Sequence, residues 1–126
     1  MSPTPQEDVR RPRARTAVAT KPPKGECCPQ LHEAVELVGK RWTGAIVYVL
    51  LQHRRPMRFS EVGAAVPELS DRLLSERMKE LEARGIVERR VLEETPVRVE
   101  YELTPMGRDL GPALRELRRW GQRHLA

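Results

Sequence analysis

The amino-acid sequence predicts a mainly α-helical protein with a small β-hairpin wing, a winged helix-turn-helix fold with N- and C-terminal dimerisation helices. Three observations support this prediction. Two short helical segments meet across the turn Pro67-Glu68-Leu69, two alternating apolar segments follow as a hairpin, and a longer amphipathic segment ends the chain. The predicted order is four helices, a hairpin and a long helix.

The composition divides the chain into a tail and one domain. A chain of 126 residues has room for one core. Residues 1–25 hold five of the 11 prolines and no aromatic side chain, so we expect a disordered, basic, proline-rich tail and a folded domain over residues 26–126. The tail carries six basic and two acidic side chains, which leaves 17 against 16 for the domain. Overall basicity therefore does not identify a partner, and the tail is either a solubilising segment or an arm that touches DNA phosphate.

The cysteines and apolar runs bear on the compartment. Cys27 and Cys28 are adjacent and too few for a disulfide framework. No stretch resembles a signal peptide or a membrane span of about 18 apolar residues. His32, His53 and His124 share no metal-ligand spacing with the cysteines. We expect a cytoplasmic protein with reduced thiols, no metal, no cofactor and no membrane partner.

The first two helices are predicted from apolar spacing. The first begins at Cys28-Pro29 and ends at Gly39, because proline suits the first helical turn and glycine the end of a helix. The second runs from about Trp42 to His53 and is apolar on most sides, which is typical of a core helix. We expect Trp42 to be a core residue without a binding role.

The remaining elements follow from caps and turns. Ser60 is the expected cap of a third helix to Val66, and Ser70 caps a fourth that ends at Gly85. Residues 86–91 and 97–103 alternate as hairpin strands joined by residues 93–96. Thr104-Pro105 begins the long last helix, in which Pro112 is a candidate site for a bend.

The fourth helix is the candidate recognition helix. Leu74, Met78 and Leu81 share one stripe, and a polar face lies nearly opposite. A polar face alone is typical of any solvated helix, but the second helix of this motif enters the major groove. On that face Arg72 suits guanine, Glu76 suits cytosine, Ser75 suits several bases and Lys79 suits phosphate. Arg77, beside the apolar stripe, is expected to hold the helix in place.

Basic side chains around this helix extend the predicted interface. Those on the hairpin would meet the DNA backbone or minor groove, and those at the start of the third helix would meet phosphate. The predicted DNA-binding set is Arg58, Ser60, Ser70, Arg72, Ser75, Glu76, Lys79, Arg89, Arg90 and Arg98.

Several short motifs, in this order, resemble the HxlR family. They are Cys28-Pro29, residues 38–43 (VGKRWT), residues 58–62 (RFSEV), residues 70–81 ahead of 85–89 (GIVER), residues 96–104 (PVRVEYELT) and Trp120-Gly121. The match covers about residues 27–122. The resemblance implies a dimeric bacterial transcription regulator related to the MarR group. Val97 replaces a second proline that is usual in the family, and an aromatic common near Leu92 is absent, so the wing is expected to differ in shape.

An apolar face predicts a homodimer. The last helix carries more apolar surface than a domain of this size can cover, so we expect it to pair with a second copy, aided by the first helix. The predicted interface consists of Leu31, Val35, Leu110, Leu114, Leu117 and Trp120. Two symmetric recognition helices would then bind an inverted-repeat operator in double-stranded DNA, with half-sites about 34–36 Å apart.

The signal to which such a regulator responds stays open. Cys28 precedes the first helix, whose N-terminus favours thiolate, and the resemblance implies a redox- or electrophile-sensing cysteine here. The adjacent Cys27 is a candidate resolving partner, and either sulfur is a candidate for the reactive one. An unreactive cysteine is the alternative. We therefore predict a nucleoid-associated DNA-binding regulator, a repressor, that responds to thiol oxidation or to a small-molecule effector. A winged helix used only for protein contact is a further alternative, whereas no catalytic arrangement favours an enzyme.

Overall fold

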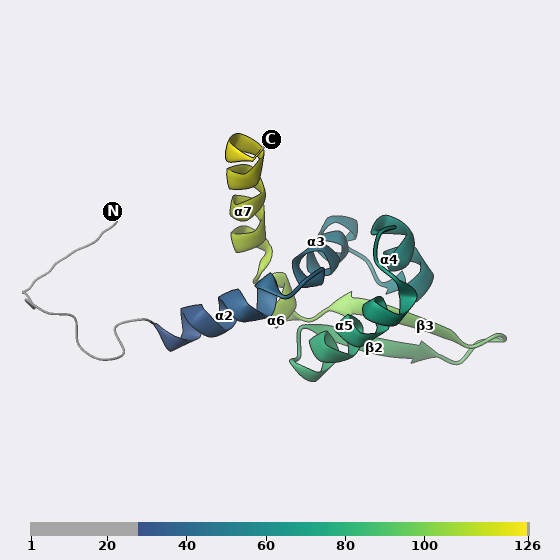
Figure 1. The fold of residues 1–126 in the computed structure, drawn as a ribbon. Helices are drawn as coiled ribbons and strands as arrows, with labels where there is room; N and C mark the ends of the chain where they lie inside the picture. Colours follow the sequence, from purple (N-terminus) through teal and green to yellow (C-terminus); the bar gives the residue numbers. More distant parts are fainter. Residues whose placement is uncertain (1–27, 126) are drawn as a thin grey trace, which may run out of the picture. The chain divides into compact units, whose positions relative to one another are not determined.

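A computed structural model describes residues 28–125 of the chain, so the predictions for the tail and for Cys27 fall outside it. Within the described residues, residues 28–34 and residues 35–125 belong to separate units. The elements, in chain order, are α2 (Pro29–Gly39), α3 (Thr43–His53), β1 (Met57–Arg58), α4 (Phe59–Ala65), α5 (Asp71–Ala83), β2 (Val87–Leu92), β3 (Arg98–Leu103), α6 (Pro105–Arg108) and α7 (Gly111–His124) (Figure 1). This confirms the predicted winged helix-turn-helix fold. Among the described helices, none combines the length and apolar character needed to cross a membrane.

The sheet has three antiparallel strands in the order β1-β3-β2. The hairpin β2–β3 was predicted, and its register pairs Val87 with Leu103. Strand β1 was not predicted. Its Met57 pairs with Tyr101 and is buried. Two residues are too few to show an alternating pattern, and their partner strand lies far along the sequence, so only the fold brings them together.

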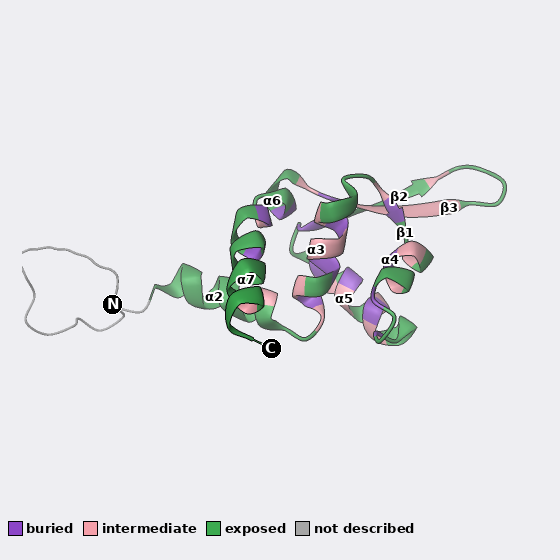
Figure 2. Ribbon diagram, turned by 90° about the horizontal axis from the view of Figure 1, so that it is seen from above, coloured by how far each residue is buried: buried purple, intermediate pink, exposed green. Residues whose placement is uncertain are grey.

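The core forms where α3, α4 and α5 meet the base of the sheet (Figure 2). Helix α3 buries Ile46, Val47 and Leu50, which confirms it as a core helix. Each buried aliphatic side chain contributes about 1.5–3 kcal/mol to folding. Trp42 packs against the same core while partly buried, and it precedes the helix in a left-handed conformation with φ of 74°. The core role expected for Trp42 is therefore confirmed, although the helix begins one residue later.

Two of the predicted helix boundaries were wrong. Ser60 does not cap α4, because the helix already begins at Phe59 and Arg58 is its N-cap. The Glu61 carboxylate accepts the Arg58 backbone N–H at 2.8 Å, as the third helical residue does in a capping box. The long last helix is interrupted after Arg108, and α7 begins at Gly111 with Pro112 in its first turn. Proline is tolerated there because the first N–H groups of a helix have no intrahelical partner.

The other predicted caps are confirmed. The Thr104 hydroxyl accepts the Gly107 N–H at 3.1 Å and starts α6. Gly85 follows α5 with φ of +77°, the left-handed conformation that favours glycine. The chain can therefore turn directly from α5 into β2, which places the wing next to the helix-turn-helix.

Candidate nucleic-acid interface

Helix α5 is held at its N-terminus and on one face. The Ser70 hydroxyl accepts the Leu73 N–H at 3.2 Å, which satisfies one of the unpaired first-turn N–H groups. Leu74, Met78 and Leu81 are buried, which confirms the predicted apolar stripe. Since one face is committed to the core, the polar residues opposite it are directed away from the protein.

The polar face of α5 carries only weak internal contacts. The Arg72 side chain is 89% exposed, and its Nε lies 3.6 Å from the Glu76 carboxylate one turn later. Such exposed pairs contribute at most about 1 kcal/mol, so Arg72 can exchange this partner for a base edge at little cost. Lys79 is exposed and makes no hydrogen bond or ion pair within residues 28–125. Ser75 is partly exposed on the same face.

Arg77 fixes the orientation of α5. Its side chain is only 11% exposed; Nε donates to the Arg41 carbonyl at 2.9 Å, and Nη1 lies 3.4 Å from Glu80. Glu80 also accepts from Lys40 at 2.9 Å, and this hydrogen bond is the main reason why the pKa of Glu80 lies below its ordinary value. The structural role expected of Arg77 is confirmed. The Lys40–Glu80 pair was missed, because nothing in the sequence links residues so far apart.

The wing directs its arginines to two faces. Arg89 pairs in register with Tyr101 and Arg90 with Glu100, and successive strand residues point to opposite faces. Arg90 is ion-paired with Glu102. Arg89 is exposed and has no such partner within the described part of the chain.

Arg98 is the most enclosed of the wing arginines. Its Nη2 lies 3.3 Å from Glu94 and its Nε 3.6 Å from Glu100. The side chain is partly buried, and Nε has no hydrogen-bond partner. Binding to phosphate would require Arg98 to leave two carboxylates, whereas Arg89 is already available.

The start of α4 already holds an anion. The Glu61 carboxylate accepts the Arg58 N–H, and this backbone hydrogen bond, followed by the one from Arg55, lowers the pKa of Glu61. The Arg58 and Ser60 side chains are exposed. A DNA phosphate at this helix end would therefore be repelled by the Glu61 carboxylate. The exposed Arg58 guanidinium is a better phosphate donor than the backbone N–H groups of the helix start.

Cys28 lies at the start of α2, as predicted. Its sulfur is exposed, accepts the Leu31 N–H at 3.4 Å and donates to the Gln30 side chain at 3.3 Å. Cys27 is outside the described residues. No group of metal-ligating side chains occurs between residues 28 and 125.

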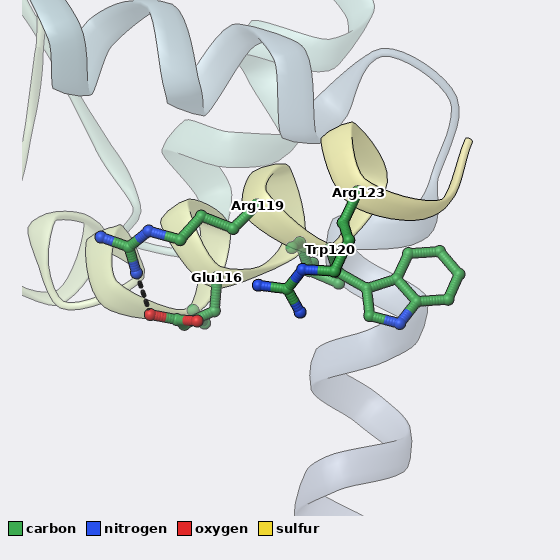
Figure 3. A pocket seen from close by; sticks show the side chains of 6 residues that line it. Glu116, Arg119, Trp120 and Arg123 are labelled. Carbon is green, nitrogen blue, oxygen red and sulfur yellow. Dashed lines mark hydrogen bonds and ion pairs between the residues drawn. The ribbon is translucent and has the colours of Figure 1, made fainter. Parts of the chain in front are cut away.

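The apolar stripe of α7 is buried at its beginning and exposed farther along. Leu114 is 7% exposed and Leu110 packs against the core, whereas Leu117 is 59% and Trp120 53% exposed. The stripe runs past the end of the core that covers it. A hollow of about 580 Å³ lies along this part of α7, and the Trp120 ring projects beside it (Figure 3). On α2, Leu31 and Val35 are exposed.

Comparison with known proteins decides the family. The HxlR-like helix-turn-helix family model matches residues 37–126. The chain belongs to the HxlR family. Its relatives include the uncharacterized HTH-type transcriptional regulator YvaP of Bacillus subtilis, which is 50% identical over 97 residues that cover 77% of this chain and 88% of YvaP.

Two solved regulators are similar to this chain in fold as well as in sequence. The reduced form of the transcriptional regulator YodB from B. subtilis has a TM-score of 0.70 and 44% identity, and the match covers 78% of this chain and 94% of the YodB chain. The diamide-treated and quinone-bound forms of YodB also match, each at a TM-score of 0.65. The redox regulator HypR in its oxidized form has a TM-score of 0.70 and 32% identity, covering 77% of this chain and 98% of HypR.

This HxlR-family chain is therefore a helix-turn-helix transcriptional regulator, and the family is not one of enzymes. The resemblance found in the sequence is confirmed. Among the predicted DNA contacts, the structure places Arg72, Ser75, Glu76 and Lys79 on one face of α5, while Arg90 and Arg98 are engaged with wing carboxylates.

Proposed function

We propose that this regulator binds double-stranded DNA sequence-specifically as a homodimer and represses transcription from an inverted-repeat operator in the bacterial cytoplasm. The observation that carries the proposal is α5 itself. It buries Leu74 and Met78 and leaves Arg72 and Lys79 exposed on its polar face. The second helix of a helix-turn-helix uses such a face, and chiefly its N-terminal residues, to read the major groove.

Arg72 is the proposed base-reading residue. It occupies the first turn of α5, is almost fully exposed, and can donate two hydrogen bonds to O6 and N7 of guanine. Glu76, its weak partner, would then accept from cytosine. Lys79 and Arg89 are the proposed phosphate contacts, because both are exposed and free of carboxylate partners within the described residues. Arg58, Ser60, Ser70, Ser75, Arg90 and Arg98 complete the proposed set, the last two after exchanging their carboxylates for phosphate.

The proposed dimer contact uses the exposed part of α7. Leu117 and Trp120 leave more than half of their surface in water. Aromatic side chains contribute strongly to interfaces, so a second copy is the natural cover for them. The exposed Leu31 and Val35 of α2 are proposed as additional contacts. Leu114 belongs to the subunit core, and its contribution is to position α7.

The test is selection of bound sequences from a random duplex pool, followed by gel-shift titration of the selected site. We expect an inverted repeat. Arg72→Ala should weaken binding of that site by about 1–3 kcal/mol and relax one position in each half-site. Arg89→Ala should weaken all sequences alike and reduce the salt slope by about one unit.

Arg118→Ala is the matched control, because Arg118 is exposed on α7 and is not among the proposed DNA contacts. Selection of no sequence, or equal behaviour of the three variants, would reject the proposed readout and favour a winged helix used for protein contact.

A thiol response is the proposed signal. Cys28 has an exposed sulfur at a helix start, and the solved YodB structures include diamide-treated and quinone-bound forms. DNA titration of wild type and Cys28→Ser, with and without diamide, tests this. Wild-type affinity should change and that of the serine variant should not. If neither changes, a small-molecule ligand becomes the better candidate signal.

A further inference from the structure

A cavity of about 360 Å³ lies where the end of α3, β3, α6 and α7 meet, away from the polar face of α5. Its floor is apolar, because Leu50 and Leu103 belong to the core and Leu51 packs against it. Four arginines and one carboxylate complete the lining. Arg54 and Arg55 follow α3, Arg108 ends α6, Arg115 lies on α7, and the carboxylate is Glu102 of β3.

The charges of this cavity do not cancel within it. Glu102 is already ion-paired with Arg90 of the wing, and Arg55 is occupied by Glu61 of α4 at 3.4 Å. Within residues 28–125, the guanidinium groups of Arg54, Arg108 and Arg115 have no carboxylate partner. Three like charges are thus gathered around one apolar hollow, which raises the local affinity for an anion.

One of these guanidinium groups is held in place. Arg108 Nη1 donates to the Leu103 carbonyl at 2.7 Å, so the group is oriented at the cavity while its other N–H donors stay available. A planar guanidinium binds a carboxylate through two parallel hydrogen bonds, and this favours an oxyanion over a spherical halide. The leucine floor provides space for a hydrocarbon group next to that oxyanion.

We propose that this cavity binds a small organic anion, a carboxylate carried on a compact apolar body. Arg54, Arg108 and Arg115 would hold the carboxylate, and Leu50, Leu51 and Leu103 would contact the apolar body. The proposal goes beyond DNA recognition. The binding reaction needs no DNA, so its outcome is independent of the function proposed above.

The experiment is isothermal titration calorimetry of the full chain with three probes. Benzoate has both the carboxylate and the apolar body, benzamide lacks the charge, and inorganic phosphate lacks the apolar body. We expect saturable benzoate binding with a Kd of about 1 mM or tighter, and binding of the other two at least about tenfold weaker. Phosphate binding as tight as benzoate, or no benzoate binding, would overturn the proposal.

Arg54→Gln and Arg115→Gln identify the site. Both side chains lack internal partners in the described residues, so the variants should fold as the wild type does, which circular dichroism checks. Each should weaken benzoate binding about tenfold. Arg118→Gln, an equal charge change on α7 outside the cavity, should leave it within about twofold. An equal loss in Arg118→Gln, or unchanged benzoate binding in Arg54→Gln and Arg115→Gln, would refute the assignment.

Discussion

Gly107 sits where α6 crosses the start of the wing, and replacing it by alanine should destabilise the protein. A Cβ atom at this position would lie 2.3 Å from the Ile86 carbonyl oxygen and 3.0 Å from Leu103 Cδ2. Real Cβ contacts essentially never fall below 3.0 Å, so α6 and the segment before β2 must separate by at least 0.7 Å. The nearest atom is backbone, and rotation of a side chain cannot relieve the overlap.

The magnitude follows from three contributions. Overpacking of a tight interior site costs about 1–3 kcal/mol. The displaced Ile86 carbonyl also accepts the Thr104 N–H at 3.0 Å, and weakening this hydrogen bond costs about 1 kcal/mol more. The higher helix propensity of alanine offsets at most about 1 kcal/mol. We expect Gly107→Ala to lower the free energy of unfolding by about 1–4 kcal/mol.

The assay is urea unfolding followed by far-UV circular dichroism, at one fixed protein concentration because a dimer would make stability concentration-dependent. Gly63→Ala in α4 is the matched control. A Cβ there would meet Leu74 Cδ2 at 3.6 Å and Asp71 Oδ1 at 3.9 Å, which are ordinary contacts. This variant should be neutral or up to about 1 kcal/mol more stable. If both variants unfold alike, the close approach of Gly107 to the wing does not limit stability.

Four further outcomes are expected. Ser70→Ala removes the acceptor for the Leu73 N–H and should cost about 1 kcal/mol in the same unfolding assay, with Ser70→Asp close to wild type. The Glu61 pKa is lowered from its ordinary value of 4.5, so its stabilising contribution is present above pH 4.5 and lost as pH falls below it; acid titration should show a smaller decline for Glu61→Gln. Trp120→Ala should shift sedimentation towards monomer, and unchanged sedimentation would remove this residue from the interface. Deleting residues 1–25 should change operator affinity only modestly in a gel shift, whereas complete loss would assign the tail to DNA binding.

Much of the fold could be predicted because its signals are local. The α5 stripe repeats at helical spacing, Ser70 and Thr104 cap the helices that follow them, and Gly85 takes the left-handed conformation that glycine favours. Each of these depends on residues within a few positions of one another. The sequence alone therefore determined the order of the first four helices and the hairpin, and which face of α5 is polar, but not strand β1 or the break between α6 and α7.

The tertiary structure decided which side chains are available on that scaffold. Whether an arginine is free depends on carboxylates brought beside it by strand pairing, and so the availability of Arg89 and the engagement of Arg90 could not be read from the chain. The cavity charges have the same origin, since the lining residues come from separate elements.

The tertiary structure also determined how far along α7 the core extends. Leu114 and Leu117 belong to one continuous apolar stripe, yet the first is buried and the second exposed. Helical periodicity determines the direction in which a side chain points, but its burial depends on how far the neighbouring elements extend. The sequence thus determined that α7 has an apolar face, and the packing of α3 determined how much of it the subunit covers by itself.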